Sequence, residues 1–256
     1  MNNFKKIAFH ASHKPRAQKA LEELKGLYSN TAPAEADVIV VLGGDGSMLR
    51  ALHQFSNLNK PIFGMNLGTL GFLLNKYNPE NLFERVNKAN RFEIHPLKMS
   101  ARDTHGNTHE EIAFNEVSLI RETHSSAKIK VIVDGKVRLE EVVCDGMLVS
   151  TPVGSTAYNS SARGPIVPLN ANVLPLTPIS VFRPRRWPGA LIHHDAKIEF
   201  EIRHAPERPV SATADAKEIR DIAHVSVQEA RSITCTLLFD ADNLLSERIF
   251  SEQFAP

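Results

Sequence analysis

The spacing of apolar residues changes once along this chain of 256 residues, near residue 98. Before that point, short apolar runs alternate with segments whose apolar residues recur every three or four positions. The clearest run is Val38–Leu42, an unbroken apolar stretch typical of a parallel strand that is covered on both faces. Apolar residues at helical spacing follow it between Met48 and Phe55. This alternation predicts an α/β layer with a parallel sheet.

Beyond residue 98, apolar residues alternate with polar ones, which is the period of a half-buried strand. Asp134-Gly135 lies between two such runs and predicts a β-hairpin. Further alternating runs occupy Ile198–Ile202, Val225–Val227 and Ile233–Phe239. These patterns predict a second region built mostly of antiparallel strands.

Two domains follow from this change of period. We expect an α/β domain over residues 1–98 and a β-rich domain over residues 99–239. The tail, residues 240–256, contains a helical pattern between Asn243 and Phe250, and we expect it to pack back on the first domain.

Composition excludes several classes of protein. Lys and Arg number 30 against 29 Asp and Glu, a formal net charge of +1, so the basic surplus of a nucleic-acid-binding protein is missing. No window approaches the ~18–20 apolar residues of a membrane span. The first residues also lack the ~7–15 apolar residues of a signal peptide. With only Cys144 and Cys235 and no disulfide framework, we expect a cytoplasmic protein that binds neither nucleic acid nor membrane.

The sharpest local motif is Gly43-Gly44-Asp45-Gly46, directly after the buried run and directly before a helical pattern. Glycines let the backbone adopt positive φ and approach a ligand closely, and backbone N–H groups at such a turn can hold phosphate. Asp45 would repel phosphate, so it needs a separate task, either binding a divalent metal or accepting a proton. The alternative is a tight turn in which Asp45 is only the helix N-cap.

Other nucleotide and metal motifs are absent from the sequence. It contains neither a P-loop nor a Gly-x-Gly-x-x-Gly fingerprint after the first strand. Neither His193-His194-Asp195 nor His109-Glu110-Glu111 has the spacing of a zinc site, so we predict no metal ligands among the site residues.

A second cluster, Thr151–Ser161, is rich in hydroxyls and small residues and contains the aromatic Tyr158. It could hydrogen-bond a base and ribose while Tyr158 packs on a ring, or it could be a loop that caps a helix. Asn115-Glu116 lies inside an apolar stretch. Because adjacent strand residues point to opposite faces, one of the pair should face inward or line a cleft, although a strand end would also explain it.

Together these motifs resemble the NAD kinase family. Gly43–Gly46 is similar to the family's GGDG box, Asn115-Glu116 to its NE pair, and Asp145 through Tyr158 to its long glycine-rich signature. The signature continues to Gly164-Pro165, and Leu176–Ile179 is similar to the segment that follows it. A GGDG box alone also occurs in lipid kinases and phosphofructokinases, whereas the long signature is more specific.

The resemblance implies phosphorylation of the adenosine 2′-hydroxyl of NAD, which gives NADP, with ATP as donor. A divalent cation, Mg²⁺, is expected to arrive with the ATP. The implied fold is a Rossmann-like α/β N-terminal domain and a mostly antiparallel β-sandwich C-terminal domain, in a homodimer or homotetramer with the active site between domains. A lipid or sugar kinase with the same box, and a non-catalytic NAD(P)-binding sensor, are the alternatives.

By position, the resemblance makes Asp45 the general base on the 2′-hydroxyl. The residues that it assigns to cofactor binding are Gly43, Gly44, Asp45, Gly46, Arg50, Asn115, Glu116, Asp145, Val153, Thr156, Ala157, Tyr158, Asn159, Ser160 and Ser161. Three departures from the family pattern stand out. Val153 replaces a usual Thr, Asn159 and Arg163 replace Ser and Gly, and Asp215-Ala216-Lys217 replaces Asp-Gly-Gln.

Overall fold

The computed structural model describes residues 2–68 and 71–241. They divide into two compact units, the first formed by the chain up to Ile94 and from Ser232, and the second by His95–Arg231. Within the described residues, no helix is both long and apolar enough to cross a membrane.

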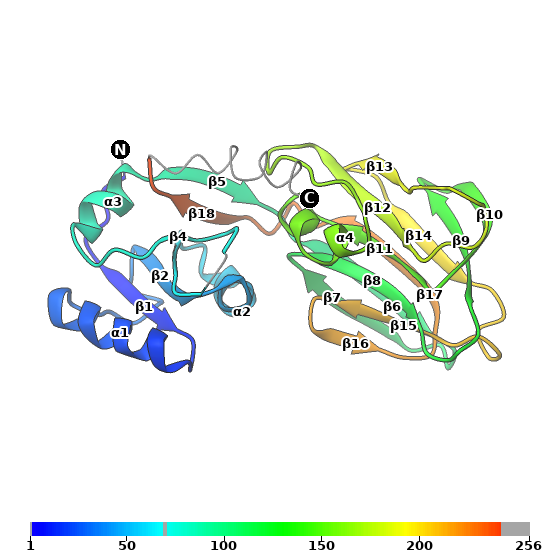
Figure 1. Cartoon of the computed structure of the whole chain (residues 1–256), viewed down its shortest axis with the longest axis horizontal. Helices are drawn as coiled ribbons and strands as arrows, with labels where there is room; N and C mark the ends of the chain where they lie inside the picture. Colours follow the sequence, from blue (N-terminus) through cyan, green and yellow to red (C-terminus); the bar gives the residue numbers. More distant parts are fainter. Residues whose placement is uncertain (1, 69–70, 242–256) are drawn as a thin grey trace. The chain divides into compact units, whose positions relative to one another are not determined.

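The first unit contains one mixed sheet, in the order β1-β2-β3-β18-β5, with β4 paired to β3 (Figure 1). Its strands are β1 (Ile7–Ala11), β2 (Val38–Gly43), β3 (Ile62–Asn66), β4 (Asn75–Lys76), β5 (Asn90–Ile94) and β18 (Cys235–Phe239). Strands β1, β2, β3 and β18 run parallel, and β5 pairs antiparallel with β18. All of β2 is buried, as its unbroken apolar sequence predicts.

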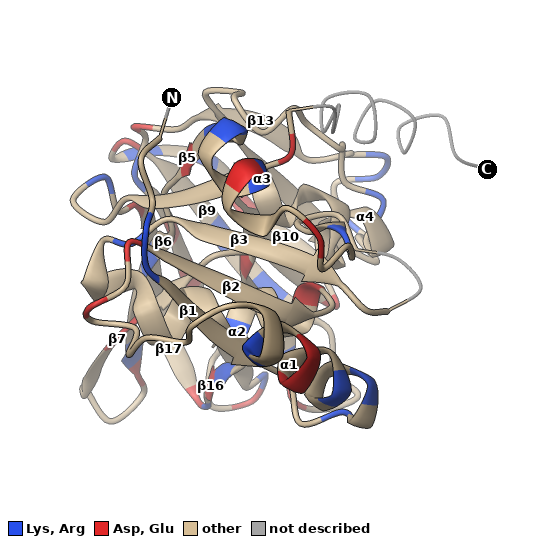
Figure 2. Cartoon of the chain, turned by 90° about the vertical axis from the view of Figure 1, so that its left-hand side faces the viewer, with Lys and Arg blue, Asp and Glu red and all other residues tan. Residues whose placement is uncertain are grey.

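Helices cover both faces of this sheet. They are α1 (Pro15–Leu27), α2 (Asp45–Phe55), the short 3-10 helix η1 (Ser56–Leu58) and α3 (Leu82–Lys88). Apolar side chains of α1 and α3 share one cluster with Phe63 and Met65 of β3. Met48 of α2 reaches Gly64, between those two, so α2 covers the opposite face. Figure 2 shows charged residues on α1 and α3, whereas β1, β2 and β3 carry none.

The expected α/β layer is therefore present, but its strand order is not that of a dinucleotide-binding Rossmann fold. That fold places its strands in the order 3-2-1-4-5-6, with the first strand in the centre. Here β1 lies at one edge of the sheet, β18 lies beside β3, and β5 adds an antiparallel strand at the other edge.

The second unit consists of two antiparallel six-stranded sheets, ordered β10-β9-β14-β17-β6-β7 and β13-β12-β11-β8-β15-β16. The strands are β6 (Leu97–Asp103), β7 (Thr108–Ala113), β8 (Glu116–Arg121), β9 (Ala127–Val133), β10 (Lys136–Cys144), β11 (Gly146–Ser150), β12 (Val173–Ile179), β13 (Ala190–His193), β14 (Ile198–Ile202), β15 (Val210–Ala214), β16 (Lys217–Ile219) and β17 (Ile222–Glu229). A 3-10 helix η2 (Val153–Thr156) and a short helix α4 (Tyr158–Ser161) follow β11.

Both sheets contribute to one apolar core, in which Phe200 of β14 and Leu119 of β8 are fully buried. Burial alternates strictly along β9 and β14, as the period of two predicts. The predicted hairpin is confirmed, with Asp134 and Gly135 both at positive φ between β9 and β10. The two antiparallel sheets agree with the expected β-rich region.

One strand lies in a different sheet from the one expected. The run ending at Phe239 forms β18, which belongs to the first unit and not to the β-rich one. Leu237, Leu238 and Phe239 are all at most 1% exposed, so this strand is covered on both faces like a central strand of an α/β sheet. The expected tail helix between Asn243 and Phe250 lies outside the described residues.

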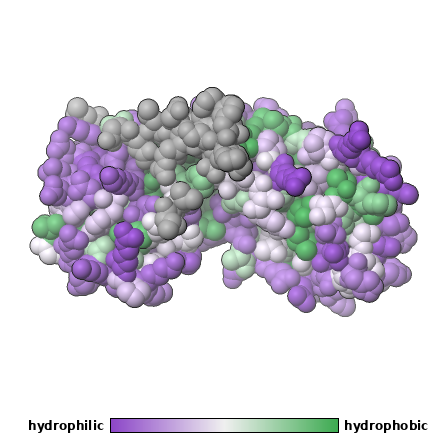
Figure 3. Space-filling view, in the orientation of Figure 1, coloured by the Kyte–Doolittle hydropathy of each residue, from purple (hydrophilic) through white to green (hydrophobic). Residues whose placement is uncertain are grey.

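On the face drawn in Figure 3, the described residues are mostly hydrophilic, with smaller hydrophobic areas between them. The large apolar side chains that are exposed within the described ranges are Leu27, Val137, Tyr158, Phe182 and Leu191.

Candidate functional site

The glycine motif forms the turn between β2 and α2. Gly43 ends the strand, Gly44 is the N-cap residue and Asp45 begins the helix. None of its three glycines has positive φ, so the expected conformational reason for them is wrong. Close approach explains Gly43, because a Cβ there would lie 2.3 Å from the Ser47 Oγ. At Gly44 a Cβ would meet nothing within 4 Å, so the space above the turn is open.

A pocket of about 250 Å³ opens over this turn. Its lining includes Gly43, Gly44, Gly46 and Ser47 from the turn, Ser12, Lys14, Arg16 and Ala17 after β1, Arg50 from α2, and Leu67 and Gly68 after β3. The carboxyl ends of parallel strands meet here, where open α/β sheets bind their ligands. Three cationic side chains and a helix N-terminus make the pocket suited to an anion such as phosphate.

Sequence reasoning found Arg50 in this pocket but missed Lys14 and Arg16. Both follow the first strand, and the carboxyl ends of β1 and β2 are neighbours in a parallel sheet. That adjacency could have identified them. Ser12 could also hydrogen-bond a ligand in this pocket. Its Oγ is buried and has no hydrogen-bond partner in the part of the chain that the structure describes.

Asp45 is half-buried, and both of its carboxylate oxygens accept backbone hydrogen bonds. The N–H of Phe72 donates to Oδ2 and the N–H of Leu73 donates to Oδ1, each at 3.0 Å. Gly44 is the N-cap residue, and no side chain caps this helix, so the alternative that Asp45 is merely the N-cap is wrong. The pocket lining is basic and holds no acidic cage, so a divalent cation fits here only as a companion of a polyphosphate.

In the second unit, the backbone at Asn115 is held tightly against the end of β11. The carbonyl of Asn115 accepts hydrogen bonds from the Thr151 N–H (2.9 Å), the Thr151 hydroxyl (3.2 Å) and the Ser150 hydroxyl (3.3 Å). Gly154 passes so close that a Cβ would lie 2.2 Å from this carbonyl oxygen. The first half of the hydroxyl-rich motif therefore positions Asn115-Glu116 rather than facing a ligand.

Glu116 has an unusual carboxyl group. Its Oε2 is buried and has no hydrogen-bond partner among the described residues. Burial, and secondarily the charge of Asp215, raises the pKa of Glu116 to about 7, although a hydrogen bond from the Tyr158 N–H acts in the opposite direction. A buried polar atom without a partner suits a ligand hydroxyl.

Tyr158 begins α4 and is 36% exposed. It lines a pocket of about 590 Å³ within the second unit, together with Ser161, Ala162, Arg163, Pro178, Ile179, Ser180, Val181, Trp187 and Pro188. Burial and the nearby carboxylates of Glu116 and Asp145 raise the pKa of the Tyr158 hydroxyl. The ring is therefore close to both carboxylates and also open to a ligand.

The remaining predicted residues of this motif differ in exposure. Thr156, Ala157 and Ser160 are half-buried, and Ser161 is exposed at the pocket. Asp145, which precedes the motif, is partly exposed, and its Oδ1 lies 2.6 Å from the Nε of Arg121.

Val153 and Asn159, both predicted to contact the cofactor, are buried in the structure. Val153 is 5% exposed. Asn159 is fully buried, and its amide nitrogen donates to the carbonyls of Ser155 (3.2 Å) and Pro165 (2.9 Å). Its Oδ1 accepts the Thr177 hydroxyl at 2.7 Å. The Asn159 side chain thus joins Ser155 and Pro165 of the loop to Thr177 of β12. Within one motif, the sequence does not distinguish such a supporting residue from one that contacts a ligand.

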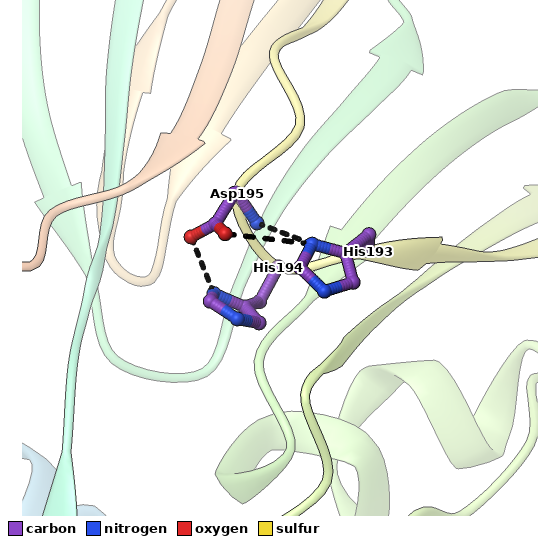
Figure 4. A group of neighbouring side chains, drawn as sticks. All are labelled: His193, His194 and Asp195. Carbon is purple, nitrogen blue, oxygen red and sulfur yellow. Dashed lines mark hydrogen bonds and ion pairs between the residues drawn. The ribbon is translucent and has the colours of Figure 1, made fainter.

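His193, His194 and Asp195 bring ligand atoms within 4.8 Å of one another (Figure 4). Arg231 already contacts this group. Its Nη2 lies 2.6 Å from the His194 Nδ1, and its Nε lies 3.8 Å from the Asp195 Oδ1 and 2.7 Å from Glu229. A cation at His194 would have to displace this guanidinium.

Comparison with known sequences decides the family. The ATP-NAD kinase N-terminal domain matches residues 2–94, and the ATP-NAD kinase C-terminal domain matches residues 114–229. The chain belongs to the NAD kinase family. The two matches lie within the two units of the structure, and they contain the glycine turn and the hydroxyl-rich motif respectively.

Individual members of the family support this assignment. NAD kinases from Hyphomonas neptunium and Caulobacter vibrioides are each 51% identical over 250 residues, which is 98% of this chain and 98% and 96% of theirs. Among solved structures, yeast NADH kinase complexed with NADH has a TM-score of 0.82 at 21% identity, covering 99% of this chain and 88% of that one. An Archaeoglobus fulgidus NAD kinase in complex with ATP has a TM-score of 0.76 at 25% identity, covering 98% and 99%.

Proposed function

We propose that this chain transfers the γ-phosphoryl group of ATP to the 2′-hydroxyl of the adenosine ribose of NAD, which produces NADP. Membership of the NAD kinase family supports the reaction. The observation that carries the assignment of the chemistry is a half-buried carboxylate, Asp45, in the turn below a pocket whose lining includes three cations and the glycines on either side of Asp45.

The pocket over the glycine turn would hold the phosphates of ATP. The open space at Gly44 leaves room for a phosphate oxygen near the first backbone N–H groups of α2, and Lys14, Arg16 and Arg50 would offset its charge. A divalent cation bound to the ATP would neutralise charge that develops on the phosphoryl oxygens. Such positioning and charge neutralisation supply most of the catalysis in phosphoryl transfer.

Asp45 would accept the proton of the ribose 2′-hydroxyl. At the same time the 2′-oxygen would bond to the γ-phosphorus of ATP, and the bond from this phosphorus to the β-phosphate oxygen would break and release ADP. The two backbone N–H donors fix the orientation of the carboxylate but occupy only part of its acceptor capacity. General-base help of this kind contributes about 10²–10⁴-fold.

The second unit would bind NAD. Asn115 and Glu116 would hydrogen-bond it, with the unpartnered Glu116 Oε2 as one acceptor, and Asp145 would add another. Tyr158 would pack on a ring, and Thr156, Ala157, Ser160 and Ser161 would surround the adenosine. We also propose that the protein acts as a cytoplasmic homodimer or homotetramer.

The experiment is to incubate the pure protein with NAD and Mg-ATP and to detect NADP with an NADP-specific dehydrogenase. Parallel reactions offer diacylglycerol or fructose 6-phosphate as acceptor. NADP formation supports the proposal. Phosphorylation of the lipid or sugar alone would identify another kinase with this box, and NAD binding without any product would identify a sensor.

A further inference from the structure

Asp215 lies at the tip of the hairpin between β15 and β16, in the left-handed region with a φ of 50°. Its carboxylate accepts hydrogen bonds from three consecutive backbone N–H groups. The N–H of Phe114 donates to Oδ2 at 2.7 Å, and those of Asn115 and Glu116 donate to Oδ1 at 3.0 and 3.3 Å. The N–H of Asp215 in turn donates to the Glu116 carbonyl at 3.1 Å.

The backbone at Asn115 is therefore held from two directions. The end of β11 binds its carbonyl, and Asp215, about a hundred residues farther along the chain, binds its N–H and those on either side. Hydrogen bonds to a charged acceptor are about twice as strong as neutral ones. The single side chain of Asp215 thus fixes the backbone of Phe114–Glu116, where β7 ends and β8 begins.

We propose that Asp215 is a positioning residue for dinucleotide binding: it holds the backbone at Phe114–Glu116 so that the Asn115 and Glu116 side chains meet NAD in one fixed geometry. This inference rests on the proposed function. The adjacent departures from the family pattern do not disturb it, because Ala216 and Lys217 are exposed. The turn needs only the left-handed residue that Asp215 supplies, a conformation that Asp tolerates.

The same carboxylate also acts on Glu116 through its charge. Asp215 is the second cause of the raised pKa of Glu116, after burial. Two further titratable groups act around this site: the Tyr158 hydroxyl, whose pKa the charges of Glu116 and Asp145 help to raise, and Asp145, which is paired with Arg121. Removing the charge of Asp215 should therefore lower the pKa of Glu116. If Asp215 held the backbone without acting on Glu116 through its charge, the pKa of Glu116 would stay the same.

The test compares Asp215→Asn and Asp215→Ala with the wild-type protein. Asn can keep the two bonds made by Oδ1 but not the bond from the Phe114 N–H, whereas Ala keeps none. We expect the KM for NAD to rise about tenfold or more in Asp215→Ala and less in Asp215→Asn, with a smaller change in the KM for ATP. Amide hydrogen exchange at residues 114–116 should accelerate in the same order.

Asp221→Asn is the matched control. Asp221 is also a left-handed Asp in the second unit, it is exposed, and no hydrogen bond to its carboxylate is found in the described ranges. It should leave exchange at residues 114–116 and the KM for NAD unchanged. A ¹³C NMR titration of the Glu116 carboxyl group should give a lower pKa in Asp215→Asn than in wild type.

Unchanged KM for NAD and unchanged Glu116 pKa in a folded, active Asp215→Asn protein would overturn the positioning role. If Asp215→Ala does not fold, the Asn variant and the NMR titration still decide it. A wild-type protein that makes no NADP would instead contradict the proposed function, and the amide exchange would still report whether Asp215 holds this backbone.

Discussion

Asp45 and Leu73 are joined by a 3.0 Å hydrogen bond, in which the backbone N–H of Leu73 donates to the Asp45 Oδ1. The preceding N–H, that of Phe72, donates to Oδ2 at the same distance. One carboxylate thus connects the start of α2 to the segment that leads into β4. The proposed general base is held in place by the backbone that it also stabilises, so its substitution affects both stability and turnover.

Gly43 and Gly44 should respond differently to substitution by Ala. A Cβ on Gly43 would collide with Ser47, so Gly43→Ala should lower the free energy of unfolding by about 1–3 kcal/mol. A Cβ on Gly44 would meet nothing within 4 Å, and its φ of −120° suits Ala. Gly44→Ala should keep its stability and instead raise the KM for ATP. Denaturant unfolding and steady-state kinetics measure the two effects, and equal stability losses would contradict this assignment of roles.

Asn159→Ala should destabilise the protein rather than act on NAD directly. The change leaves the carbonyls of Ser155 and Pro165 and the hydroxyl of Thr177 without their partner in a fully buried site. We expect a loss of about 2–4 kcal/mol in the free energy of unfolding. Ser161→Ala is the control at the exposed pocket and should stay within about 0.5 kcal/mol. A stable Asn159→Ala protein with weakened NAD binding would restore the contact role predicted from sequence.

Part of the fold could be predicted from the sequence because it is local. The buried run of β2 and the Asp134-Gly135 hairpin are each encoded within about ten residues. The sheet that β18 joins could not be predicted, since its neighbours β3 and β5 lie well over a hundred residues away. Alternation predicts that a strand forms, but it does not indicate which strands will pair with it.

The candidate site shows the same limit. Its motifs are visible in sequence, but they mix residues that could touch a ligand, such as Tyr158, with buried supports such as Asn159. The contact between Asp215 and Asn115 spans about a hundred residues and depends on the neighbouring strands β8 and β15. No local pattern could have indicated it.

Tyr158→Ala should weaken NAD binding more than ATP binding. A ring packed on a base contributes about 1–3 kcal/mol by analogy with base–aromatic stacking. Because Tyr158 is 36% exposed, its loss should change stability little. Calorimetric titration with each nucleotide gives both affinities, and Tyr158→Phe, which keeps the ring, should bind NAD nearly as well as wild type. An unchanged affinity of the Ala variant for NAD would make the residue merely structural.

Glu116 should make the protein less stable as the pH rises toward 7. Its pKa of about 7 in the folded state exceeds the ~4.3 of an exposed Glu, so the folded state keeps a proton that the unfolded state has released. The stability of wild type should therefore fall, relative to Glu116→Gln, between about pH 4.3 and 7 and then level off. We expect a change of about 1–2 kcal/mol, because one pKa unit is about 1.4 kcal/mol and solvent screening reduces the full amount.

Urea unfolding of both proteins at several pH values measures this difference, and other titrating groups cancel in the comparison. Glu207→Gln, which makes the same substitution at an exposed position, is measured alongside for comparison. A constant difference between wild type and Glu116→Gln would mean that Glu116 is ionised like an ordinary surface residue.

The most direct test of the central claim is to assay wild type and Asp45→Asn side by side for NADP formation from NAD and Mg-ATP. Asn is nearly isosteric, but its NH₂ must face one of the two N–H donors, so the variant should fold with a stability loss of about 1–3 kcal/mol. Circular dichroism and NAD binding at 25 °C check that the site survives. We predict that wild type forms NADP and that turnover of the variant falls by at least about 10²–10⁴-fold. Full activity in a folded Asp45→Asn protein, or no NADP from wild type, would contradict the account.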